Sequence, residues 1–186
     1  MAGKKSELGP SGTAVWHNVQ RLREKQRLSY AELSRNLAEM GREIPPLGLR
    51  RIESGERRVD ADDLVALAIA LGVTPATLLM PSAATDDVEV EVTGPAMAVS
   101  AVRLWNWLVA RQPLDGSTDS DVGDSADDAA VKFMRWMQWA VEVHPDWMVG
   151  DLAEAVKRGL PEGRARTVFE SGVPSRRIAN RRGRES

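Results

Sequence analysis

Residues 44–55, IPPLGLRRIESG, decide the fold of the first half of the chain. Proline does not fit inside a helix but favours its first turn, so a helix is predicted to begin near Pro46. Leu49 and Ile52 lie three residues apart and would form its buried face, which leaves two arginines between them near the end of the helix. The stretch is therefore interpreted as a short helix that the surrounding segments hold outward.

Length and composition bound the class of the protein. With 186 residues, 42% of them hydrophobic, the chain can hold one good-sized core or two small ones. It has no cysteine and no run near the roughly 18 apolar residues of a membrane span, and no apolar segment follows the N-terminal lysines as in a signal peptide. We therefore expect a cytoplasmic protein without membrane contacts, disulfides or thiolate metal sites.

The formal net charge of −2 conceals a segregation of charge along the chain. Residues 1–80 carry 12 basic and 10 acidic groups, residues 81–155 carry 4 and 14, and residues 156–186 carry 9 and 3. An acidic middle between basic ends is informative for a chain that binds a polyanion, because only the ends would face it. The alternative is that the charged blocks only keep flexible segments in solution.

Start and stop signals predict a series of short helices. Residues 1–12 are rich in Gly, Ser, Lys and Pro and are expected to be a flexible arm, with Thr13 capping the first helix. Ser29-Tyr30-Ala31-Glu32 has the form of a capping box. Gly48 costs about 1 kcal/mol relative to alanine inside a helix, which predicts a close approach there. The predicted helices span about residues 13–26, 29–41, 46–53, 60–72 and 74–79, and Pro81 ends the unit.

Three motifs follow one another across this segment. They are Leu28-Ser29 before Ala31-Glu32-Leu33, then Ile52-Glu53-x-Gly55-Glu56-Arg57, then Leu64-x-x-Leu67-Ala68-x-x-Leu71-Gly72-Val73-x-Pro75-x-x-Leu78-Leu79. With these motifs, residues 15–80 resemble the lambda-repressor-like, Cro-type (XRE family) helix-turn-helix domain. The resemblance implies an all-α domain of five helices at 13–81. Such a domain lays its third helix in the DNA major groove, usually as a dimer on paired half-sites.

The resemblance also implies roles for individual residues. Arg23 and Glu53 would form a salt bridge that ties the first helix to the end of the third. Tyr30 lies at the start of the second helix, where the family often contacts a phosphate. The positions that most often read base edges in the family are occupied here by Pro46, Leu47 and Gly48.

Two features depart from the family pattern. None of the three base-reading positions has a polar side chain, which leaves apolar contact by Leu47, close backbone approach at Gly48, and arginine contacts. About five extra residues, at 37–43, predict a longer second helix or a wider turn. We therefore expect weak base discrimination and binding led by phosphate neutralisation. The arginines expected to contact DNA are Arg50 and Arg51 at guanine or phosphate, and Arg57 and Arg58 at phosphate.

The second half of the chain is predicted to be helical and rich in tryptophan. In the linker at 82–95, residues 88–92 (VEVEV) alternate with period two and predict a short strand, either half of a hairpin or a strand supplied to a dimer. The tryptophans would form a helical core or a dimerisation or effector surface. Helices are expected at 96–111, 127–143 and 146–158 within a helical region at 96–160, with a disordered acidic loop at 114–128 and a disordered basic tail at 161–186.

The sequence contains no recognisable catalytic motif. It lacks a Gly-rich phosphate loop, an HExxH motif and a nucleophile elbow, and its two histidines are far apart. We therefore expect no enzyme activity, no cofactor and no metal. The predicted function is a repressor-like transcriptional regulator, prokaryotic or phage-encoded, whose partners are double-stranded DNA and a second copy of the chain. The alternative is a protein-interaction module, such as an antitoxin or adaptor, whose tryptophan-rich half binds a protein partner.

Overall fold

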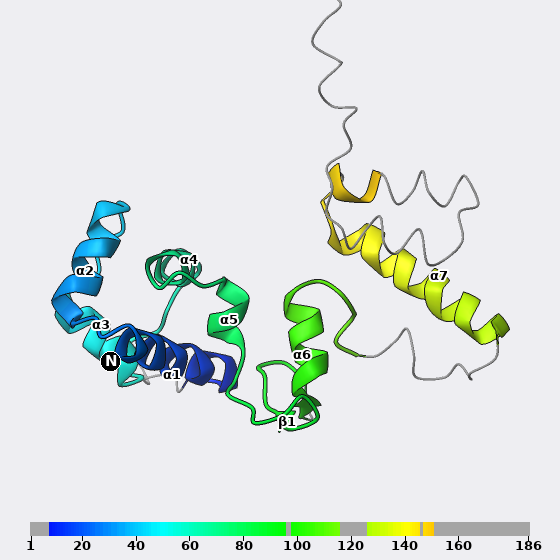
Figure 1. Ribbon diagram of the computed structural model, residues 1–186, viewed down its shortest axis with the longest axis horizontal. Coiled ribbons are helices and arrows are strands. Elements are labelled where there is room, and N and C mark those ends of the chain that lie inside the picture. Colours follow the sequence, from blue (N-terminus) through cyan, green and yellow to red (C-terminus); the bar gives the residue numbers. More distant parts are fainter. Residues whose placement is uncertain (1–7, 96–97, 116–125, 146, 151–186) are drawn as a thin grey trace, which may run out of the picture. The chain divides into compact units, whose positions relative to one another are not determined.

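The computed structural model describes residues 8–95, 98–115, 126–145 and 147–150 (Figure 1). The chain divides into two compact units, Met1–Val109 and Ala110–Ser186, and each is described here by itself. Most of the described residues are helical, and the one sheet among them has two short strands.

The first unit begins with a series of helices joined by short connections. The helices are α1 (Pro10–Lys25), α2 (Tyr30–Glu39), α3 (Pro46–Glu53), α4 (Ala61–Ala70) and α5 (Pro75–Leu79). Figure 1 shows α1 to α5 gathered into one bundle, in which α1 packs against α3 and α5, and α2 packs against α3 and α4.

The first helix starts earlier than the sequence predicts. Residues 10–12 belong to α1, so the flexible arm does not extend to residue 12 and Thr13 is not the cap. Gly9 takes the N-cap position in an extended conformation, with φ −74° and ψ 174°. Proline is favoured at the first helical position because it has no N–H to leave unsatisfied, and Pro10 therefore starts the helix three residues earlier.

Side-chain caps begin α2, α4 and α5. At the start of α2, the backbone N–H of Glu32 donates to Ser29 Oγ at 3.2 Å and the backbone N–H of Ser29 donates to Glu32 Oε2 at 2.8 Å, which completes the capping box. Asp60 Oδ1 accepts a hydrogen bond from the backbone N–H of Asp63 at 2.7 Å and caps α4. Thr74 caps α5 in the same way.

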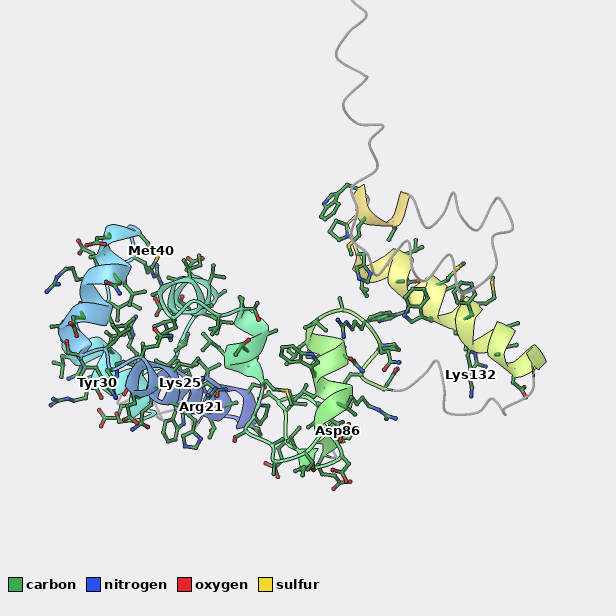
Figure 2. The ribbon with its side chains drawn as sticks, in the orientation of Figure 1. Arg21, Lys25, Tyr30, Met40, Asp86 and Lys132 are labelled. Atoms are coloured by element: carbon green, nitrogen blue, oxygen red, sulfur yellow. The ribbon has the colours of Figure 1, made fainter. Side chains whose placement is uncertain are left out.

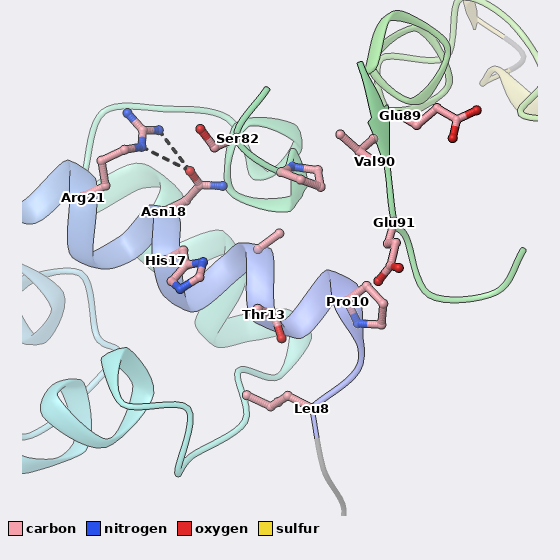
Figure 3. Close-up of a pocket in the computed structure, with 12 residues that line it drawn as sticks. Leu8, Pro10, Thr13, His17, Asn18, Arg21, Ser82, Glu89, Val90 and Glu91 are labelled. Atoms are coloured by element: carbon pink, nitrogen blue, oxygen red, sulfur yellow. Dashed lines mark hydrogen bonds between the residues drawn. The ribbon is translucent and has the colours of Figure 1, made fainter. Parts of the chain in front are cut away.

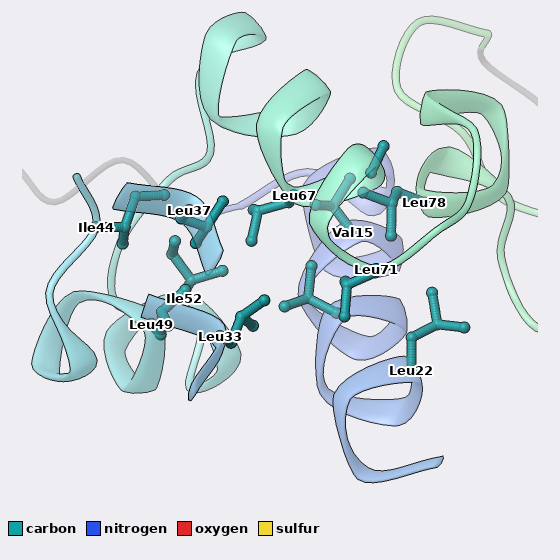
Figure 4. Packing of buried hydrophobic residues seen from close by; sticks show 12 residues of the cluster. Val15, Leu22, Leu33, Leu37, Ile44, Leu49, Ile52, Leu67, Leu71 and Leu78 are labelled. Carbon is teal, nitrogen blue, oxygen red and sulfur yellow. The ribbon is translucent and has the colours of Figure 1, made fainter. Parts of the chain in front are cut away.

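A single apolar core joins these helices (Figure 4). It takes the inward stripe of every helix, at the positions that the helical period predicts. From α3 it takes Leu49 and Ile52, both fully buried. The buried members of the core are Val15, Val19, Leu22, Leu33, Leu37, Ile44, Leu49, Ile52, Leu67, Ala68, Leu71 and Leu78.

The connection between α2 and α3 is wide, and it absorbs the extra residues. Helix α2 ends at Glu39 and α3 begins at Pro46, so residues 40–45 form the turn. Two contacts of one residue, Ile44, anchor the turn. Ile44 is buried in the core, and its carbonyl accepts a hydrogen bond from Ser34 Oγ at 2.7 Å. The extra residues therefore lie in a longer turn rather than in a longer helix.

A short hairpin follows the helices, and its first strand lies within the strand predicted at 88–92. Strands β1 (Glu89–Val90) and β2 (Val99–Ser100) pair antiparallel, with Val90 opposite Val99. Helix α6 (Ala101–Leu108) begins only after β2, whereas the sequence predicts a helix from residue 96. Its start is delayed because Val99 and Ser100 are held extended by the pairing with β1.

The second unit contains α7 (Ala126–Val143) and a further helical turn at 147–150. Trp136, Met137 and Ala140 are buried in a small cluster with Phe133, Trp139 and Met148 packed against it. Residues 126–128 are helical, so the predicted loop does not extend to residue 128. The rest of that loop at 116–125, the helix beyond 150 and the tail at 161–186 lie outside the described residues. In the part that is described, no helix is both long and apolar enough to span a membrane.

The orientation of α3 gives a direct test of the fold. Leu49→Ala removes a fully buried side chain and should lower the free energy of unfolding by about 2–5 kcal/mol. Leu47→Ala, two residues away on the same helix, removes a side chain that is 58% exposed and should change it by less than about 0.5 kcal/mol. Urea denaturation of both variants measures the difference. Equal losses would show that α3 is rotated from its position here.

Candidate nucleic-acid interface

Helix α3 presents one face to the core and the other to solvent. Leu49 and Ile52 point inward, whereas Leu47, Arg50 and Arg51 are exposed. Residues three and four apart lie on the same side of a helix, so Leu47 shares its outward face with both arginines. An apolar group and two cations therefore stand together on the outward face of α3.

The Arg23–Glu53 salt bridge implied by the resemblance is present. Arg23 Nε donates to Glu53 Oε1 at 2.6 Å and Arg23 Nη2 donates to Glu53 Oε2 at 2.8 Å, so the pair is bidentate. Both side chains are nearly buried, at 11% and 3% exposed. Arg23 Nη1 also donates to the carbonyl of Leu28. The hydrogen bond to Glu53 raises the pKa of Arg23. The pair fixes the end of α3 against α1 and the start of α2.

Tyr30, expected to contact a phosphate, lies at the start of α2 (Figure 2). Its hydroxyl is turned toward the Arg23–Glu53 pair. The hydroxyl donates to Glu53 Oε2 at 2.9 Å, and the guanidinium of Arg23 lies 4.3 Å from the centre of the ring. Burial and the hydrogen bond to Glu53 raise the pKa of the hydroxyl, which stays protonated as a donor. Tyr30 therefore has a structural role here, and a phosphate contact would require its hydroxyl to leave Glu53.

A second acidic anchor, which the sequence does not reveal, lies at Asp63. This aspartate is 1% exposed and accepts two charged hydrogen bonds, each 2.7 Å long. One comes from Arg42 Nε in the wide turn, and the other from Arg57 Nη2 in the connection after α3. Arg42 also pairs with Asp60 at 3.0 Å. Asp63 thus joins the segment before α3 to the segment after it.

The same network explains why position 48 is a glycine. A Cβ built on Gly48 would lie 2.9 Å from Arg57 Nη1 and 3.2 Å from Ile44 Cγ2. A side chain at position 48 would crowd the guanidinium of Arg57, which donates to Asp63. Gly48 therefore serves the packing of α3 onto its neighbours, which is the close approach that its helix position predicts.

The expected DNA-contacting residues fall into two groups. One group is exposed on or beside α3: Pro46, Leu47, Arg50, Arg51 and Arg58. The other group is partly buried and holds the helix in place: Tyr30, Gly48 and Arg57. Arg50 also lies near the Tyr30 ring, with its guanidinium carbon 5.6 Å from the ring centre.

Residues 19–78 match a family model described as Helix-turn-helix. This segment is a helix-turn-helix domain of the lambda-repressor-like type. The match covers α2 and α3, both anchoring acids and most of the apolar core. Neither a curated protein nor a solved structure matches the chain.

A pocket of about 780 Å³ lies between α1 and the segment that follows α5 (Figure 3). Buried Asn18 donates from Nδ2 to the carbonyls of Leu78 and Met80, and its Oδ1 accepts from the guanidinium of Arg21. Glu89 and Glu91 line the cavity on the side of β1. These two carboxylates repel a polyanion, so this side of α1 is a poor surface for DNA.

The first prediction for the site concerns Glu53. Glu53→Gln keeps the size of the side chain but leaves the nearly buried Arg23 without a counter-charge, which should lower the free energy of unfolding by about 3 kcal/mol. Glu43→Gln makes the same chemical change at an exposed position in the wide turn and should have almost no effect. Thermal and urea denaturation measure both. If Glu53→Gln were as stable as Glu43→Gln, the Arg23–Glu53 salt bridge would not stabilise the fold.

A second prediction concerns pH. Hydrogen bonds from the Ser29 hydroxyl and backbone hold the pKa of Glu32 below its ordinary value, and the backbone N–H of Asp63 does the same for Asp60. A carboxylate with a lower pKa in the folded state stabilises the fold above its unfolded pKa. That stabilisation is lost as the pH falls through the folded pKa. Melting temperature should therefore fall as the pH drops below about 4.

Variants at the two caps test this origin of the acid sensitivity. Glu32→Gln and Asp60→Asn keep hydrogen-bond acceptors at the caps but do not titrate, so the drop in melting temperature between pH 7 and pH 3 should be smaller. Glu43→Gln is the control and should show the drop of the unmodified chain. An unchanged drop in the cap variants would place the acid sensitivity elsewhere.

Proposed function

We propose that the chain is a transcriptional regulator that binds duplex DNA by placing α3 in the major groove. The observation that carries the proposal is the outward face of α3, where Leu47, Arg50 and Arg51 stand exposed. The buried Glu53 holds the end of this helix, and Asp63 ties together the turns on either side of it. A rigid helix with cations on its outer face suits a groove lined by phosphates. The match of residues 19–78 to the Helix-turn-helix family supports the same reading.

The two arginines of α3 would serve mainly to neutralise phosphates. Arg51 forms no ion pair with another described residue, and Arg50 is held only by its contact with the Tyr30 ring. Exposed Arg58, in the connection after α3, would add a further contact. Each neutralised phosphate releases counterions, so affinity should fall steeply with salt.

The proposal extends to the manner of action. We infer a repressor-like regulator of prokaryotic or phage type that works in the cytoplasm as a homodimer on paired half-sites. It would act through binding and not through catalysis. Footprinting a site selected from random duplex DNA tests the dimer. A two-fold symmetric dimer requires a two-fold symmetric site, in which the centres of the two half-sites lie about one helical turn apart.

Charge reversal at α3 tests DNA binding. Arg50→Glu and Arg51→Glu should each weaken binding to the selected site by about tenfold or more and lower the slope of log affinity against log salt by about one. Together they should abolish binding, while circular dichroism stays unchanged. Arg103→Glu is the matched control, because it reverses one exposed charge in α6 of the same unit. Unchanged affinity in both α3 variants would contradict the placement of α3 in the groove.

A further inference from the structure

The start of α3 is an exposed apolar tip. Pro45 and Pro46 are both exposed, and Leu47 is the only leucine among the described residues that is more than half exposed. Every other leucine near it, such as Leu33 and Leu49, is fully buried in the core. An isolated exposed leucine is ordinary on a protein surface, but this one stands on the face that meets DNA in the proposed function.

The tip also has few hydrogen-bond donors. Pro45 and Pro46 have no N–H, and the N–H of Leu49 already donates to the carbonyl of Pro45 at 3.0 Å. Gly48 has no side chain, and its Cα faces the Arg57 guanidinium. The side chains of this tip therefore cannot read a base by hydrogen bonding. Apart from the backbone N–H groups of Leu47 and Gly48 in the first turn, the outer end of the helix offers an aliphatic surface.

In the major groove, the group that suits contact with an aliphatic side chain is the C5-methyl group of thymine. Thymine presents its C5-methyl group there, whereas cytosine and uracil carry only a hydrogen at the same ring position. Methylation of cytosine at C5 places a methyl group at the same ring position as in thymine. A domain whose leucine packs against this position would therefore favour thymine. Its affinity for the DNA would rise when a cytosine at that position is methylated.

The arginines on the same face would bring Leu47 to the bases. Arg50 and Arg51 follow Leu47 by three and four residues, so all three side chains share one side of α3. The cations lie toward the end of the helix and the apolar tip at its start. Contacts from the arginines to phosphates would fix the depth and register of the helix, and the tip would then meet the base edges.

We propose that Leu47 is a specificity-determining residue that reads the C5-methyl group of a pyrimidine in the major groove. The regulator selects thymine at this position and distinguishes 5-methylcytosine from cytosine. This assignment rests on the proposed function, because it requires α3 to lie in the groove. The assignment restricts the preferred DNA sites to those with a pyrimidine C5-methyl group facing Leu47.

Four duplexes test the assignment at each pyrimidine of the selected site. They differ only at that base pair, in which the pyrimidine is thymine or uracil opposite adenine, or 5-methylcytosine or cytosine opposite guanine. Covering one methyl group is worth about a fourfold change in Kd. The full chain should therefore bind thymine about fourfold more tightly than uracil at one position, and 5-methylcytosine about fourfold more tightly than cytosine there. Fluorescence anisotropy at constant salt gives the ratios.

Variants assign the preference to one side chain. In Leu47→Ala and in the near-isosteric, polar Leu47→Asn, both ratios should fall to about one, whereas Leu47→Met keeps an apolar contact and should retain them. Val65→Ala is the matched control, since it shortens an exposed aliphatic side chain on α4 and should leave both ratios intact.

The outcomes separate the assignment from the proposed function. If the chain binds the site but equally well with thymine and uracil at every position, or if Leu47→Ala keeps the ratio of the unmodified chain, the assignment is wrong and the regulator function stands. If the chain binds no duplex at all, the proposed function fails, and the assignment fails with it.

Discussion

The position of α3 depends on the carboxylate of Glu53. This buried group accepts hydrogen bonds from Arg23 at 2.6 and 2.8 Å and from the hydroxyl of Tyr30 at 2.9 Å, so it draws α1, α2 and α3 to one point. An ion pair with so little exposure is costly to desolvate, and it contributes mainly by fixing one geometry. Leu49 and Ile52 add the apolar contacts that set the rotation of the helix.

Asp63 applies a second constraint on the other side of the same helix. It binds Arg42 before α3 and Arg57 after it, and it lies in the first turn of α4. With both acids engaged, α3 is held at its end and across its flanking turns. The preorganised helix would then lose little conformational entropy when it meets a partner.

The sequence predicts the helices well and the anchors unevenly. Local signals, such as the Ser29 capping box and the prolines at 45–46, mark where α2 and α3 begin. The Arg23–Glu53 pair could be expected only from the resemblance to a family. Asp63 was missed because an aspartate in the first turn of a helix is usually exposed, and its partners lie 21 and 6 residues away. Strand β2 was missed because a two-residue pairing with β1 leaves almost no local pattern.

The division of labour within α3 has a consequence for how such a domain diversifies. The side chains that hold the helix, Glu53 and Leu49 among them, face inward, whereas Leu47 and Arg51 carry no part of the scaffold. Mutations can therefore replace the outward residues one at a time without destabilising the fold. Descendants of this chain could acquire new targets through a few surface replacements, each neutral to folding and immediately open to selection.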